Sequence, residues 1–75
     1  MNPTTTLLHN AQRAFQRARP QRDIREAYRE SGRLLTRYTQ RLPNTQDGLR
    51  ARQHLNELAD GYLRRCRRAR LEDQE

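Results

Sequence analysis

Large apolar side chains recur along this chain at alternating steps of three and four residues, and this spacing restricts the chain to helices. The clearest run forms an unbroken heptad pattern at Ile24, Tyr28, Ser31, Leu35, Tyr38 and Leu42. Positions three and four apart share one face of an α-helix, whereas a half-buried strand needs apolar residues at alternate positions. No such alternation of Val, Ile or Thr lies between the prolines and glycines. We therefore expect an all-α fold.

Proline and glycine divide the chain into three helical segments. The first is expected at about residues 6–18, where a threonine run precedes an apolar face that includes Phe15. The second is expected at about 20–42, with Pro20 at its first position, and the third at about 45–71. The turn at Pro43 and Asn44 is too short for anything but an antiparallel pair. We predict one small domain over residues 1–75, a three-helix bundle in which the short N-terminal helix packs across a helical hairpin and an acidic tail occupies 72–75.

The predicted core is thin, because the chain holds only about fifteen large apolar side chains. A domain of this size hides roughly 60% of its unfolded surface and usually needs a disulfide, a metal or a partner to supplement the core. Cys66 is the single cysteine, and two histidines, His9 and His54, are too few for a closed zinc site. A partner chain is the remaining supplement. We predict a homodimer that self-associates through Tyr28, Leu35, Tyr38 and Leu42.

No pattern typical of an active site is visible in the sequence. The acidic residues of the second and third segments alternate with arginines at helical ion-pair spacing, and Cys66 falls on an apolar strip that favours burial. The three glycines are too far apart for a phosphate-binding loop. We expect no catalytic, cofactor-binding or metal-binding residues and therefore no enzyme.

Basic charge is the strongest compositional feature. The chain has 16 basic residues against 9 acidic ones, a net charge of +7, and every basic residue is arginine. The absence of lysine is typical of a GC-rich genome and indicates a bacterial or bacteriophage source. Five arginines crowd into residues 64–70, directly before the acidic tail. Such a cluster can form a helix face exposed to water, contact nucleic-acid phosphates or attract an acidic protein surface.

These observations favour a small non-enzymatic regulatory or adaptor protein, an inhibitor or accessory factor that binds another protein. The predicted partner-binding residues are Leu63, Arg64, Arg65, Arg67 and Arg68, where an apolar anchor lies among groups that steer an acidic partner. The other interpretation of Leu63 is that the first helix covers it as core. The alternative function is an arginine-rich nucleic-acid-binding protein. No apolar run suits a membrane span or an export signal, so we expect a cytoplasmic protein.

Overall fold

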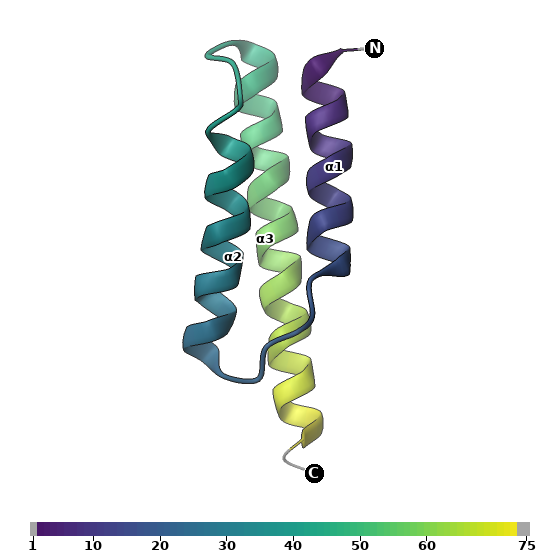
Figure 1. Ribbon diagram of the computed structural model, residues 1–75, viewed down its shortest axis with the longest axis vertical. Helices are drawn as coiled ribbons and strands as arrows, with labels where there is room; N and C mark the ends of the chain where they lie inside the picture. The colour runs from purple at the N-terminus through teal and green to yellow at the C-terminus, as the bar shows by residue number, and fades with distance from the viewer. Residues whose placement is uncertain (1, 74–75) are drawn as a thin grey trace.

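The computed structural model describes residues 2–73, apart from the side chain of Asp73, and folds them into three packed α-helices without a strand among those residues. They are α1 (Pro3–Arg17), α2 (Ile24–Thr39) and α3 (Gln46–Asp73). In Figure 1, α2 runs antiparallel to both other helices, while α1 lies alongside α3 and runs in the same direction. The all-α fold and the antiparallel hairpin are confirmed. The first helix lies beside the hairpin rather than across it.

The first helix begins earlier than the threonine run suggests. Asn2 is its N-cap, because the Asn2 side chain accepts a hydrogen bond from the Thr4 backbone N–H at 2.9 Å, and Pro3 occupies the first turn. The threonines therefore lie inside α1 instead of capping it. The helix ends at Arg17, and Ala18 is already extended, one residue before Arg19, where Pro20 disfavours helical geometry.

The second helix is shorter than predicted at both ends. It begins at Ile24 because Asp23 is the N-cap, accepting hydrogen bonds from Arg25 N at 2.8 Å and Glu26 N at 3.3 Å. Pro20 consequently lies in the α1–α2 connection, residues 18–23. The last helical residue is Thr39, and residues up to Leu42 continue as tight turns, with Leu42 N donating to Thr39 O at 3.1 Å.

The turn between α2 and α3 brings two backbone segments very close together. Thr45 caps α3 by accepting a hydrogen bond from Gly48 N at 3.2 Å. Gly48 is buried, and a Cβ atom at this position would lie 1.8 Å from the carbonyl oxygen of Pro43. Glycine is therefore required at this turn. The helix that follows has 28 residues against 16 in α2, so its C-terminal turns extend past the start of α2 (Figure 1).

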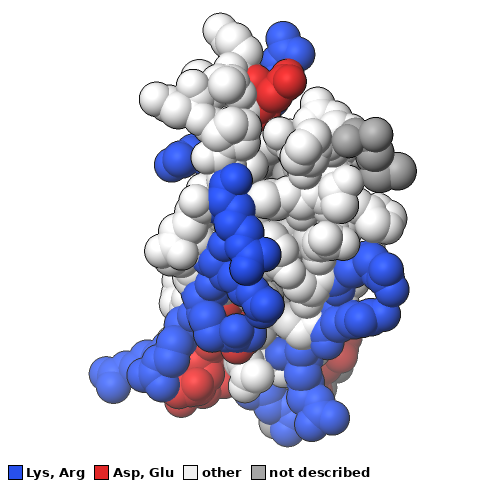
Figure 2. All heavy atoms as spheres, turned by 45° about the horizontal axis from the view of Figure 1, so that its top comes forward, with Lys and Arg blue, Asp and Glu red and all other residues white. Residues whose placement is uncertain are grey.

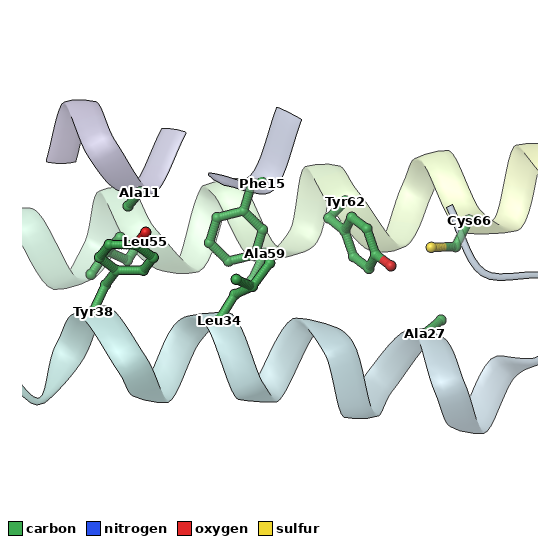
Figure 3. Packing of buried hydrophobic residues seen from close by; sticks show 9 residues of the cluster. All are labelled: Ala11, Phe15, Ala27, Leu34, Tyr38, Leu55, Ala59, Tyr62 and Cys66. Atoms are coloured by element: carbon green, nitrogen blue, oxygen red, sulfur yellow. The ribbon is translucent and has the colours of Figure 1, made fainter. Parts of the chain in front are cut away.

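All three helices contribute to one core, with aromatic rings at its centre (Figure 3). Phe15 from α1 and Tyr62 from α3 lie with their ring centroids 6.3 Å apart. The buried apolar side chains of the cluster are Ala11, Phe15, Ala27, Leu34, Tyr38, Leu55, Ala59, Tyr62 and Cys66.

The buried face of α2 differs from the predicted heptad. The residues that α2 buries are Ala27, Ser31, Leu34 and Tyr38. Two members of the predicted pattern, Ile24 and Tyr28, are 54% and 57% exposed. They stay outside the core because small Ala27 faces α3 opposite Cys66, where Tyr28 would hold the helices apart (Figure 3).

Candidate functional site

A shallow hollow lies where α3 passes the beginning of α2 and the connection that precedes it. Its volume is about 70 Å³. We call it the Leu63 hollow, and its lining consists of Gln21, Arg22, Ile24, Ala27, Tyr28, Leu63, Cys66, Arg67 and Arg70.

The floor and walls of the Leu63 hollow are apolar. Ala27 and Cys66 are buried, and Leu63 is partly buried against the core. Ile24 and Tyr28 are more than half exposed although they are large and apolar. Two helices therefore join their apolar side chains into one accessible patch. The burial of Cys66 agrees with its predicted role as a small hydrophobe.

The rim of the Leu63 hollow is positively charged. Arg22, Arg67 and Arg70 line it, and none of the carboxylates whose side chains the structure describes does so. The acidic side chains at the start of α2 are engaged elsewhere: Asp23 accepts from the backbone of its own helix, and Glu26 pairs with Arg29 at 2.8 Å. The hollow thus combines apolar surface with an excess of positive charge.

Side chains of α3 hold the α1–α2 connection in place beside the hollow. The Tyr62 hydroxyl donates to the carbonyl oxygen of Arg19 at 3.0 Å, and Gln21 N donates to Cys66 Sγ at 3.3 Å. Arg65 donates to the carbonyl oxygen of Phe15 in the last turns of α1, and its guanidinium lies 5.5 Å from the centroid of the Tyr62 ring. The contacts to Arg19 and Gln21 hold the connection where it forms one wall of the hollow.

Tyr62 is held in its neutral form by this packing. Burial raises the pKa of the Tyr62 hydroxyl well above its ordinary value, with a further contribution from the Cys66 thiol that faces it in Figure 3. Arg65 opposes the shift in the pKa, but its effect is smaller. The hydroxyl therefore acts as a hydrogen-bond donor to the connection.

The structure separates the five predicted partner-binding residues. Leu63 and Arg67 line the hollow, whereas Arg65 turns to α1. Arg64 and Arg68 are exposed but do not line the hollow. Leu63 is partly buried against the core and lines the hollow together with residues of α2, and the alternative that the first helix covers it as core stays a prediction.

The four predicted self-association residues are also in different environments. Tyr28 is exposed at the Leu63 hollow, Leu35 and Leu42 are partly buried against the core, and Tyr38 is buried. Of the lining residues, sequence reasoning assigned Tyr28, Leu63 and Arg67 to an interface and missed the others, Ile24 and Arg70 among them. The available signal for Ile24 was its place at the start of the heptad pattern.

Charge elsewhere on the surface is distributed in bands. Figure 2 shows long bands of arginine on the visible face, separated by uncharged surface and accompanied by acidic side chains at several points.

Among the described residues, no group of three or more His, Cys, Asp or Glu side chains is placed to hold a metal ion. None of the described helices has the length and apolar character needed to cross a membrane. Comparison with protein families, curated proteins and solved structures finds no match to this chain.

Proposed function

We propose that this chain is a small non-enzymatic regulatory or adaptor protein that acts by binding another protein at the Leu63 hollow. The observation that carries the proposal is the exposure of Ile24 and Tyr28 next to partly buried Leu63. Large apolar side chains grouped at a surface and bordered by charged groups are typical of protein interfaces. A chain of 75 residues can act in this way by covering or bridging its partner's surface, as an inhibitor or accessory factor does.

Capture from a bacterial lysate tests this proposal when the hollow itself is varied. The immobilised chain is compared with an Ile24→Ser and Tyr28→Ser double variant, and with Leu49→Ser as the control. Leu49 is 57% exposed, as Tyr28 is, but it does not line the hollow. A protein that binds to the wild type and the control but not to the double variant supports the proposal. Equal capture by all three would contradict it.

The variants avoid Leu63 for a physical reason. Leu63 packs against the core, so its replacement lowers both stability and binding, and the two effects are hard to separate. Ile24 and Tyr28 are exposed, and each replacement should change the free energy of unfolding by no more than about 0.5 kcal/mol. A urea denaturation curve of the double variant checks that the fold is kept.

Nucleic-acid binding is the alternative function, and the exposed arginines Arg64, Arg67 and Arg68 favour it. Under the main proposal, duplex DNA binding is weak, indifferent to sequence and lost between about 50 and 200 mM salt. Nuclease treatment of the lysate should therefore leave protein capture unchanged. Sequence-selective DNA binding that survives the higher salt concentration would make nucleic-acid binding the favoured function.

A further inference from the structure

We infer that the partner presents an acidic segment that inserts one bulky apolar side chain into the Leu63 hollow. This inference rests on the proposed function and adds the chemistry of the bound segment. Three properties of the hollow carry it: its size, its charge, and the repulsion that this charge would cause between two copies of the same surface.

The size of the hollow selects a side chain over a small-molecule ligand. Its volume is about 70 Å³. Since a water-sized group needs about 10–15 Å³ of such volume, roughly five to seven non-hydrogen atoms fit, which is one leucine or aromatic side chain. Pockets for small-molecule ligands are usually about 300 Å³ or more. Ala27, Leu63 and Cys66 would surround the inserted group with apolar atoms.

The charge of the rim selects an acidic segment. Arg29 and Arg33 on α2 pair with Glu26 and Glu30, so their charges are compensated within the chain. No salt bridge joins Arg67 or Arg70 to a carboxylate whose side chain the structure describes. Both arginines are exposed beside the apolar patch, where carboxylates flanking an inserted side chain would meet them.

The same charges disfavour a symmetric dimer through the hollow. In a two-fold interface the same patch of both copies meets, so the arginine rims of the two hollows, with Arg67 and Arg70, would be brought together. The chain carries a net charge of +7, which adds repulsion at longer range. An acidic partner reverses both effects and is attracted from a distance.

Selection from a displayed random-peptide library tests the inference. The library is panned against the wild-type chain after depletion on the Ile24→Ser and Tyr28→Ser variant, so that only peptides dependent on the hollow remain. We expect these peptides to share a leucine or aromatic residue flanked by Asp or Glu. Hollow-dependent peptides without acidic residues would overturn the inference and leave the proposed function standing. The recovery of no hollow-dependent peptide would contradict both.

A charge exchange locates the acidic contact. Arg67→Glu should weaken binding of a selected peptide by about five- to ten-fold at low salt, and a Glu→Lys change in the peptide should restore it. Arg52→Glu is the matched control, since Arg52 is exposed on the same helix about 22 Å away. An equal loss of affinity in both variants would mean that only net charge matters, and it would overturn the assignment to the hollow.

Discussion

Gly48 has the most restricted surroundings of the three glycines. A Cβ atom at this position would meet the Pro43 carbonyl oxygen at 1.8 Å, and backbone atoms cannot move aside without shifting the whole turn. We predict that Gly48→Ala lowers the free energy of unfolding by about 1–3 kcal/mol or more. Urea denaturation followed by circular dichroism measures the change.

Gly32 provides the matched comparison, because nothing lies within 4 Å of a Cβ atom built there. Alanine is the better helix former by about 1 kcal/mol, so Gly32→Ala should stabilise the protein by up to that amount. The neighbouring Ser31 is buried, whereas Gly32 is exposed, so small size matters at Ser31 and not at Gly32. Stabilisation by Gly48→Ala, or strong destabilisation by Gly32→Ala, would contradict this account of the room for a Cβ atom at the two glycines.

Tyr62 makes the free energy of unfolding depend on pH in the alkaline range. Because burial raises its pKa in the folded chain above the ordinary value of 10.0, the unfolded chain loses the hydroxyl proton first as the pH rises. The contribution of the Tyr62 hydroxyl to the free energy of unfolding is complete below about pH 10. Above that pH it declines by at most about 1.4 kcal/mol per pH unit. Unfolding free energies measured from pH 8 to 11 should therefore fall at the alkaline end.

Tyr62→Phe separates this effect from other titrations. The variant loses the hydrogen bond to Arg19 O, which should cost about 0.5–1.5 kcal/mol at neutral pH. It should also have a smaller decline in stability above pH 10 than the wild type. An unchanged pH profile would contradict the account of Tyr62.

At the scale of elements, the sequence predicts the number of helices, their order and the antiparallel hairpin. It does not predict which of two adjacent lines on α2 is buried. Both lines have steps of three and four residues, and the predicted one has the larger side chains. The two lines share Ser31 and Tyr38, and the buried line adds Ala27 and Leu34. Small Ala27 permits the close packing of α2 on α3.

Single substitutions on α2 test this choice of buried face. Leu34→Ala should lower the free energy of unfolding by about 2–5 kcal/mol, because Leu34 is 3% exposed in the core. Ile24→Ala should change it by no more than about 0.5 kcal/mol, since Ile24 is 54% exposed. Thermal or urea unfolding of both variants gives the comparison. Equal costs would restore the heptad interpretation.

Helix ends were predictable only in part, for a local reason. Pro20 and Asp23 both favour a helix start, and only the side-chain hydrogen bonds of Asp23 show that it is the cap. The α1–α2 connection that results is held by Tyr62 and Cys66, which are 43 and 45 residues from the atoms they contact. Such long-range contacts leave no trace in local spacing. The wall of the Leu63 hollow could not be derived from the sequence for the same reason.

At the scale of the whole molecule, self-association remains a prediction. Tyr28 is the exposed member of the four residues assigned to it, and it lies beside the arginine rim. A dimer formed through Tyr28 should therefore strengthen as salt screens the facing arginines, whereas a complex with an acidic partner should weaken. Equilibrium sedimentation at micromolar concentration and two salt concentrations measures this. A dimer that weakens with salt would contradict the argument from charge.

The candidate site was predicted in fragments. Leu63 and Arg67 were identified from the arginine-rich end of α3, and Tyr28 was identified as an interface residue for a different partner. What the sequence could not show is that Leu63, Tyr28 and Ile24 meet, because the start of α2 and the end of α3 are far apart in the chain. Only the antiparallel packing of the two helices makes them one surface.

Hydroxyl-radical footprinting of the captured complex tests most directly whether the Leu63 hollow is the binding surface. Tyr28 and Leu49 are each 57% exposed in the free chain, so both should react readily without the partner. In the complex, the reactivity of Tyr28 should fall toward that of buried Tyr62, while Leu49 should stay as reactive as before. Unchanged reactivity of Tyr28 in the complex, or protection of Leu49 instead, would contradict the account.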